Sequence, residues 1–372
     1  MMTIKKVENR KDQKAFIMLP FELYKGNAFW IPPIIKDEYK IFNRETNPAM
    51  DFCDSCFWIA EENGKTIGRI AAIINHRYNE KVGEKLGRFS RLESIDDADV
   101  IAALLRTAED WVREKGMTKI HGPLGFTNLD LQGLLIEGFD HLPSIASVYH
   151  HPYYQAHIEK CGYEKENDWL EFRLKLEDHI PEKATRMVDL IKTRFKLRVV
   201  SFKSKNEMLP YAHKLFTLLN AAFEELPYVS AFDEKTKKFY IKKYFSFLNP
   251  EFVKVVLDEH NELRAFIVGL PSLSRAMQKC NGKLFPFRFR HILHALKHPT
   301  EMDLLLTGVD PVLQSQGVAA VLIFELQQVL LKYKVPFVET TGIFESNNKA
   351  ITTWKNYEHI QHKRRRCFAK NI

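Results

Sequence analysis

Several features that would indicate a secreted, disulfide-bonded or membrane-spanning protein are missing from this sequence. Only five of its 372 residues are cysteines, and this odd, scattered set suits a reducing compartment. No apolar run is long enough to span a bilayer, and the opening residues MMTIKKVENRKDQ lack the apolar core of a secretory signal. These absences predict a cytoplasmic location.

The spacing of cysteine and histidine gives little support for a metal or redox centre. Cys53 and Cys56 form a CxxC pair, but a structural zinc site needs a second pair and none is suitably spaced. A thioredoxin-like site would lie at a strand–helix junction, whereas this pair leads into a predicted strand. His291, His294 and His298 share one helical face without an obvious acidic partner. We therefore expect no metal.

The excess of positive charge indicates an anionic partner or simply a solvated basic surface. The formal net charge is +8 and the isoelectric point is near 9.0. Because no RNP signature, zinc-finger spacing or helix-turn-helix pattern is present, we do not expect a nucleic acid partner. A membrane surface or a polyphosphate ligand would also match the charge.

The order of predicted elements is mixed α/β and occurs twice. The first half predicts a helix over 11–25, a hairpin over 57–75, a strand over 87–94, a helix over 96–116 and a closing helix and strand over 150–176. The second half predicts a strand over 197–202, helices over 205–226 and 233–248, a hairpin over 252–271, a strand over 302–309, a helix over 314–334, a strand over 336–342 and a helix over 346–357. This internal duplication predicts two domains, residues 1–178 and 179–372, with a seam in the charged stretch 176–186.

The second half carries an insertion between its hairpin and its next strand, residues 273–299. Phe285, Phe287 and Phe289 alternate there with Arg288 and Arg290. A helix packed on its own domain would explain this segment. A basic, aromatic lid that covers an apolar ligand, or a peripheral contact with a membrane through residues 284–298, would explain it as well.

The stretch GVDPVLQSQGVA, residues 308–319, has the character of an anion-binding turn. A buried strand ends at Asp310-Pro311 and a helix follows, and the first amides of a helix have no internal partners. Gly317 would let a phosphate approach the backbone, and no acidic residue lies between Val312 and Phe324. An ordinary β–α junction with a convenient glycine fits the spacing equally well.

Taken together, these features resemble the GNAT superfamily of acyl-CoA-dependent N-acyltransferases. Its motif [Q/R]-x-x-G-x-[G/A], opening a helix after a strand, is matched by Gln314, Gly317 and Ala319, and Asn347 follows the next strand at the expected offset. The resemblance implies a mixed α/β sheet, two GNAT-like domains in tandem and acyl-CoA as cofactor. It places the pyrophosphate on the turn and the pantetheine beside the preceding strand, and thus implies these cofactor-binding residues: Thr307, Val309, Gln314, Gln316, Gly317, Val318, Ala319, Ala320 and Asn347.

The first half departs from this motif where a pyrophosphate would bind. Asp96, Asp97 and Asp99 begin its helix and would repel an anion, so only the second half should hold the cofactor. The first half is then a degenerate repeat that shapes the acceptor site. The polar candidates for acceptor binding come from its long loop and the residues after it: Asn128, Glu137, His150, Tyr153 and Tyr154.

Amide formation needs a neutral amine, so a base must remove a proton directly or through water. The resemblance places that base on the strand before the phosphate turn, which offers Glu301 and Asp303, or on the neighbouring strand, which offers Glu339. The superfamily's usual acid, a tyrosine, is replaced by Trp354, and Tyr357 lies one turn later. The resemblance therefore implies transfer of an acetyl or longer acyl group to a small-molecule or lipid amine. A silent acyl-CoA-binding module and an aminoacyl-tRNA-dependent transferase are the alternatives.

Overall fold

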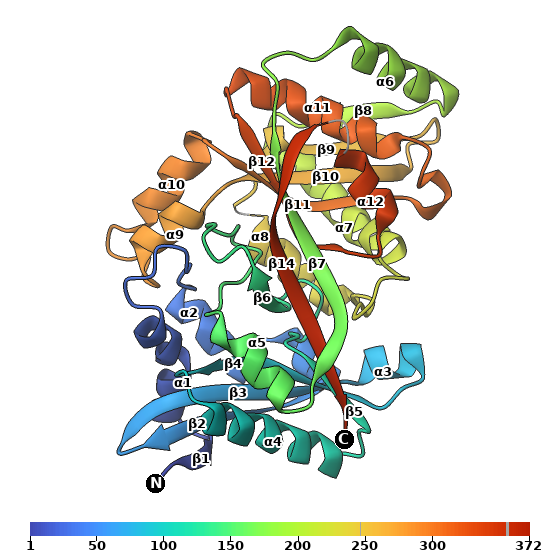
Figure 1. Ribbon diagram of the computed structural model, residues 1–372. Helices are drawn as coiled ribbons and strands as arrows, with labels where there is room; N and C mark the ends of the chain where they lie inside the picture. The colour runs from blue at the N-terminus through green and yellow to red at the C-terminus, as the bar shows by residue number, and fades with distance from the viewer. Residues whose placement is uncertain (246, 355–356) are drawn as a thin grey trace. The chain divides into compact units, whose positions relative to one another are not determined.

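The computed structural model describes residues 1–245, 247–354 and 357–372 (Figure 1). The parts of the predicted helices 233–248 and 346–357 that fall on residues 246 and 355–356 lie outside the described residues. The chain forms two compact units. Unit 1 comprises Met1–Leu170, Met277–Phe289 and Lys363–Ile372, and unit 2 comprises Glu171–Ala276 and Arg290–His362.

Unit 1 is built on a mixed sheet with helices that cover its apolar faces. Along the sheet the strand order is β1 (Thr3–Lys6), β2 (Cys53–Glu62), β3 (Lys65–Asn75), β4 (Leu86–Ser94), β5 (Lys119–Gly122) and β14 (Glu358–Asn371), while β6 (Leu134–Glu137) pairs with β14. Neighbours are antiparallel except for β4 and β5. The α-helices of this unit are α1 (Arg10–Leu23), α2 (Ile35–Glu38), α3 (His76–Val82), α4 (Ala98–Glu114) and α5 (Tyr153–Lys160).

Local sequence signals account for the best-defined elements of unit 1. The β2–β3 hairpin turns at Asn63-Gly64, both with positive φ, as the Asn-Gly signal predicts. Helix α4 begins at Asp97, whose side chain accepts from the amides of Asp99 and Val100. Its buried face, which includes Leu104, packs in the main core cluster with residues of β3 and β4.

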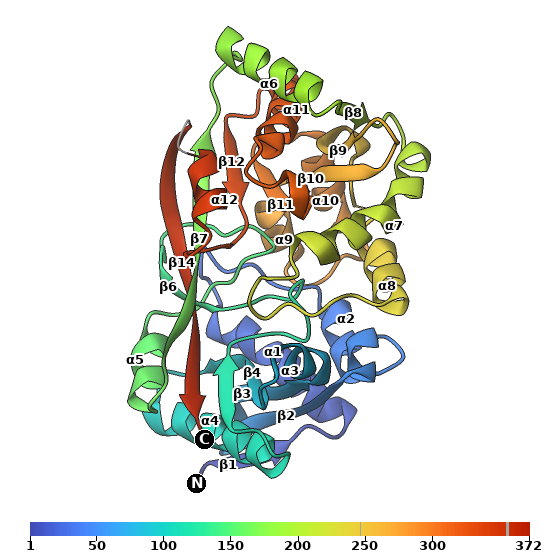
Figure 2. The same ribbon diagram turned by 90° about the vertical axis from the view of Figure 1, so that its right-hand side faces the viewer.

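Unit 2 repeats this plan. Its strand order is β7 (Glu164–Lys175), β12 (Phe337–Thr340), β11 (Met302–Val309), β10 (Leu263–Pro271), β9 (Val253–Leu257) and β8 (Arg198–Ser201), and β13 (Ile343–Phe344) pairs with β7. Helices α11 and α7 lie on opposite faces of β9–β11 (Figure 2). The unit's α-helices are α6 (Glu182–Arg194), α7 (Lys205–Ala222), α8 (Glu234–Tyr244), α10 (Phe289–Lys297, which begins at the unit boundary), α11 (Val318–Lys332) and α12 (Asn348–Thr353).

Two strands each begin in one unit and end in the other. The last residues of β7 pair with β12 of unit 2, and the last residues of β14 pair with β5 of unit 1. Residues 277–289, from the second half of the sequence, also belong to unit 1 and contain the end of α9 (Ser274–Cys280). The division at residue 178 stays a prediction, because no single cut in the chain separates the compact units. In addition, α6 begins within the charged stretch 176–186 and continues to Arg194.

Among the described residues, no helix has the length and apolar character needed to cross a membrane.

Candidate functional site

The main feature of unit 2 is a parallel strand pair that separates. Strands β11 and β12 pair at three positions only, Met302 with Val338, Asp303 with Glu339 and Leu304 with Thr340. Strand β11 nevertheless continues to Val309 against its antiparallel neighbour β10. In the part of the chain that the structure describes, no strand pairs with the second edge of β11 from Leu305 to Val309. Backbone groups at this edge can therefore bond a ligand that lies along it.

A β-bulge marks the point at which the strands part. The register of the β10–β11 pair shifts between Val268 and Gly269, so that Leu305 is an extra residue on β11. A bulge bends a strand and increases its twist, which turns β11 away from β12 directly after their last paired position. The predicted pantetheine contacts Thr307 and Val309 lie on the segment beyond this bulge.

The turn after β11 leads into a helix head that offers free amides. Gly317 adopts φ +82° and precedes α11, and no side chain caps this end. Within residues 1–245, 247–354 and 357–372, the N–H groups of Gly317, Val318 and Ala319 find no acceptor, whereas Ala320 already donates to Gly317. Gly317 is exposed to solvent. The helix head therefore has the properties of an anion site.

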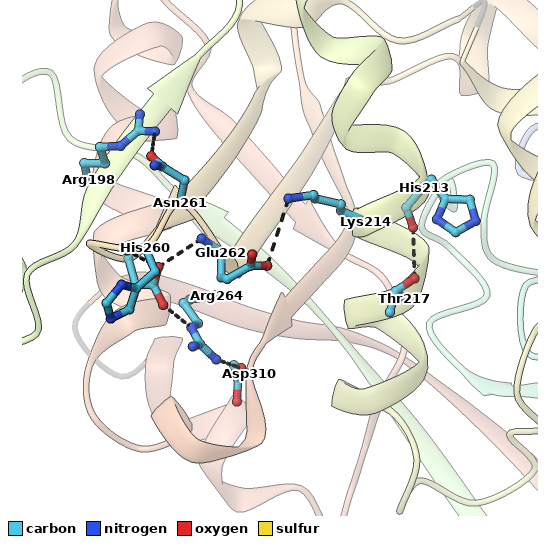
Figure 3. A network of polar contacts seen from close by, with 10 residues as sticks. Arg198, His213, Lys214, Thr217, His260, Asn261, Glu262, Arg264 and Asp310 are labelled. Carbon is cyan, nitrogen blue, oxygen red and sulfur yellow. Dashed lines mark hydrogen bonds and ion pairs between the residues drawn. The ribbon is translucent and has the colours of Figure 1, made fainter.

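A network of charges holds the start of this turn in place (Figure 3). Asp310 accepts from Arg264 at 2.8 Å and from the amide of Val312 at 3.0 Å, and its own amide donates to the carbonyl of Arg264. Arg264 also donates to Asp258, whose carboxylate accepts the amides of His260 and Glu262. The carboxylate nearest to the helix head is thus paired with a cation, which limits its repulsion of an anion.

Three of the predicted catalytic carboxylates lie at the paired end of β11 and β12. Asp303 and Glu339 are directly opposite each other and therefore share one face of the sheet, while Glu301 precedes β11 and is half-buried. Glu339 is buried and accepts from Arg173 of β7 in an ion pair. The structure therefore brings Asp303 and Glu339 together as partners at one register position of β11 and β12.

The environment of Asp303 makes its carboxylate a stronger base than that of a solvated aspartate. The side chain is fully buried, and neither carboxylate oxygen has a hydrogen-bond partner of good geometry among the described residues. Burial raises the pKa of the Asp303 carboxyl well above its usual range, and the neighbouring carboxylates of Glu339 and Glu301 raise it further. Burial also raises the pKa of Glu339, which the Arg173 charge opposes. Perturbed carboxyls of this kind are typical of sites that move protons.

The other predicted residues near the second strand have structural partners. Asn347 caps α12 by accepting from the amide of Ala350 at 3.1 Å. The Tyr357 hydroxyl donates to Gln327 at 3.2 Å, and burial raises its pKa. Trp354 is buried, and its indole N–H has no acceptor in the described part of the chain. Gln314 donates from its side chain to the carbonyl of Val309 at 3.3 Å. The roles of Asn347, Gln314 and Tyr357 at a cofactor stay predictions.

Unit 1 contains the counterpart of this cleft, but protein groups fill it. Strands β4 and β5 also pair at three positions only. The Tyr154 hydroxyl then accepts from the amide of Ser94 at 2.7 Å and lies 2.9 Å from its carbonyl, and Tyr153 donates to the same carbonyl. Leu124 donates its amide to Phe89 of β4. These contacts bond backbone groups of β4 beyond its pairing with β5. In unit 2 the carbonyls of Leu305 and Val309 accept from the side chains of Thr341 and Gln314, and no strand of the described chain covers the edge, which supports the prediction that only the second half holds a cofactor.

The other acceptor candidates of unit 1, His150, Glu137 and Asn128, have different chemical environments. His150 is buried and accepts from the amide of Leu135, and burial together with the Arg365 charge lowers its pKa to about 3. Glu137 is exposed and pairs with Arg364, and Asn128 has a buried side-chain oxygen without a partner among the described residues. Acceptor binding by the five predicted residues stays a prediction: Asn128, Glu137, His150, Tyr153 and Tyr154. In addition, the described residues hold no group of three or more His, Cys, Asp or Glu side chains suited to a metal ion.

Sequence reasoning missed one component of the site, helix α6. A Cβ built on Gly317 would lie 2.8 Å from Cδ1 of Ile191 on this helix, and Lys192 pairs with Glu325 of α11. Helix α6 thus packs beside the helix head, as Figure 1 also shows. The apolar side of the helix pattern, with Val188 and Ile191, was the available signal.

Comparison with known proteins identifies the fold. No family model matches the chain. Two curated bacterial proteins are similar: "Protein YghO" of Escherichia coli, 29% identical over 371 residues (98% of this chain and 94% of that protein), and the "Bacterial ceramide synthase" of Caulobacter vibrioides, 27% identical over 303 residues (78% and 75%).

Solved structures agree on the architecture. A tandem GNAT protein from the clavulanic acid biosynthesis pathway aligns with a TM-score of 0.56 at 13% identity, covering 100% of this chain and 98% of that one. A GCN5-related glucosamine N-acetyltransferase region of a fungal multi-domain protein gives 0.58 at 12%, where this chain spans 38% of the larger protein. The predicted resemblance to GNAT proteins and the α/β fold with two such domains in tandem are thereby confirmed.

Proposed function

We propose that the chain is an acyl-CoA-dependent N-acyltransferase whose cofactor binds to unit 2. The observation that supports this most strongly is the combination of an unpaired β11 edge with the unbonded amides of Gly317, Val318 and Ala319. Gln314, Gln316 and Ala320 complete the turn, and Thr307 and Val309 supply backbone groups to the pantetheine. Bound acyl-CoA would provide the thioester that is attacked.

We assign the proton-accepting role to Asp303, with Glu339 and Glu301 as the carboxylates that tune it. A general base works best when its pKa lies near the working pH, and burial moves the Asp303 carboxyl in that direction. Arg173 fixes Glu339 beside Asp303, so that the two carboxyls cannot both ionise without repulsion. Tyr357 is the candidate acid, although a CoA thiolate can leave without one.

We further propose that the acceptor is a lipid amine and that the acyl group is long. A ceramide is an amide of a long-chain amino alcohol, so the name of the Caulobacter relative suggests this class of acceptor.

The test is a titration of the purified chain with acetyl-CoA and palmitoyl-CoA, followed by measurement of thiol release with a panel of amines. We expect palmitoyl-CoA to bind and a long-chain amino alcohol such as sphinganine to support turnover, with little turnover for ethanolamine or a polyamine. Binding without turnover across the panel would show a silent acyl-CoA-binding module. Failure to bind either thioester would refute the proposed cofactor.

A further inference from the structure

The insertion between β10 and β11 presents an apolar tip that the proposed transferase chemistry does not use. The side chains of Phe285 and Phe287 are 77% and 66% exposed and flank Pro286. Folded proteins rarely place two large aromatic side chains together in solvent without a binding role. We call residues 280–289 the aromatic loop.

Hydrogen bonds between the two ends of the aromatic loop hold its tip in the exposed position. Arg288 donates its guanidinium to the carbonyl of Cys280 at 2.9 Å, and the Cys280 thiol donates back to the carbonyl of Arg288. The amide of Phe289 donates to the carbonyl of Leu284 at 2.8 Å. These bonds join the two ends of the loop and leave the phenylalanines between them.

The base of the loop is also fixed to the rest of unit 1. Gln278 donates from its side chain to the carbonyls of Ala28 and Trp30, and the amide of Ile35 donates to the carbonyl of Gly282. Gly282 sits so close to Phe21 that a Cβ would lie 2.7 Å from that ring. The tip is therefore presented on a rigid support.

The segment that contains the aromatic loop carries charge of one sign along the sequence. Residues 263–300 contain no aspartate or glutamate, and the part of this stretch that belongs to unit 1 carries the cations Lys279, Lys283 and Arg288. The chain passes directly into α10, where Ile292 is buried and His291, Leu293, His294 and Lys297 are exposed. Aromatic side chains together with cations match the interface of an anionic bilayer, where rings enter the acyl boundary and cations meet the headgroups.

We propose that the aromatic loop docks the protein on the surface of an anionic lipid bilayer. An RNA partner would use the same cations but would need the phenylalanines to stack on its bases, and the test below distinguishes it from a bilayer. This inference goes beyond the proposed transferase function and does not depend on it, since vesicle binding is measured without any acyl-CoA.

The test is co-sedimentation of the full chain with vesicles of phosphatidylcholine alone or of phosphatidylcholine mixed with anionic phosphatidylglycerol, to which basic segments are attracted. We expect binding to the anionic vesicles only, weaker at higher salt. We expect Phe285→Ala with Phe287→Ala to reduce the partition coefficient at least about tenfold, as the loss of two inserted rings implies. Lys283→Glu with Lys297→Glu should reduce it by a similar factor.

The matched control is Phe247→Ala, which removes a 43% exposed phenylalanine outside the insertion. This variant should bind vesicles as the wild type does. All variants should unfold at the wild-type temperature, because the altered side chains are exposed. Equal vesicle binding by the wild type and the double phenylalanine variant would overturn the proposal. So would binding to single-stranded RNA that exceeds binding to anionic vesicles.

Discussion

The replacement of Gly317 by glutamate is the sharpest test of the cofactor site. Gly317 precedes α11, and a glutamate there would place a carboxylate among the free amides that we assign to the diphosphate. Two effects follow, one on folding and one on binding. The residue has φ +82°, and the new Cβ would meet Cδ1 of Ile191 at 2.8 Å, which is the movable end of a flexible side chain.

The effect on folding should be small compared with the effect on binding. An L-residue in the left-handed region costs about 1–2 kcal/mol of stability, which leaves an ordinary domain folded. The carboxylate and one unit charge of a diphosphate, about 5 Å apart in water, repel by about 0.8 kcal/mol. Two such charges give roughly 1.7 kcal/mol, which is about a fifteen-fold loss of affinity. Loss of the close amide contacts adds to this.

Isothermal titration with acetyl-CoA would measure the loss, and two variants separate its causes. Gly317→Ala introduces the backbone strain and the contact with Ile191 without the charge. Gly116→Glu introduces the same residue at a glycine with the same φ of +82°, at the end of α4, where a Cβ meets nothing within 4 Å. We expect near-normal affinity for Gly116→Glu and an intermediate value for Gly317→Ala. Unchanged affinity in Gly317→Glu would refute the assignment of the helix head.

Three further variants test the proposed base Asp303, the ion pair of Arg264 with Asp310, and the filled cleft of unit 1. Asp303→Asn should stabilise the fold at neutral pH, since a buried amide carries no charge and takes up no proton on folding, and should lower turnover roughly 10²–10⁴-fold if Asp303 is the base. The pKa of Asp303 is higher in the folded than in the unfolded chain, so its contribution to stability is present at low pH and is lost as the pH rises from the unfolded-state pKa through the folded-state pKa. The unfolding temperature of this variant should therefore change less with pH than that of the wild type. Arg264→Met should weaken acetyl-CoA binding by about threefold, because it leaves Asp310 unpaired. The double variant Arg264→Met with Asp310→Asn should restore the affinity, and a failure to restore it would contradict the electrostatic account. Tyr154→Phe should destabilise the protein in urea unfolding by about 1–3 kcal/mol through its lost bonds to Ser94 and leave acetyl-CoA affinity unchanged; weakened affinity would show that the unit 1 cleft takes part in binding.

Much of the fold follows from local signals in the sequence. The Asn63-Gly64 turn, the Asp97 cap and the hydrophobic spacing of α11 each predict their element because the determining residues are neighbours along the chain. The GNAT motif around Gly317 is likewise local. Its glycine does lie at the helix head with a positive φ, where its lack of a Cβ has a direct use.

The remaining features depend on contacts between distant residues and have no local signal. Residues 173–175 at the end of β7 pair with β12, and residues 368–371 at the end of β14 pair with β5. No local turn signal in the sequence predicts these pairings. Helix α6 was not predicted because Pro181 and the surrounding charges suggested a linker. Its packing on α11 requires only one apolar stripe. The burial of Asp303 could not be predicted either, because a carboxylate at a strand end is normally solvated.

The two clefts differ in a way that would let a duplicated chain bind a cofactor in one half only. In both units a parallel strand pair holds for three positions and then parts, which leaves strand-edge groups that must bond to something. In unit 1, Tyr154 and Leu124 satisfy this edge permanently, and Asp97 occupies the head of the following helix. In unit 2 no strand covers the corresponding edge, and the amides of the helix head are unbonded among the described residues. A fold that satisfies the first cleft internally gains rigidity there, whereas the second leaves its edge to water or to a ligand, and we infer that this difference separates a supporting repeat from a working one.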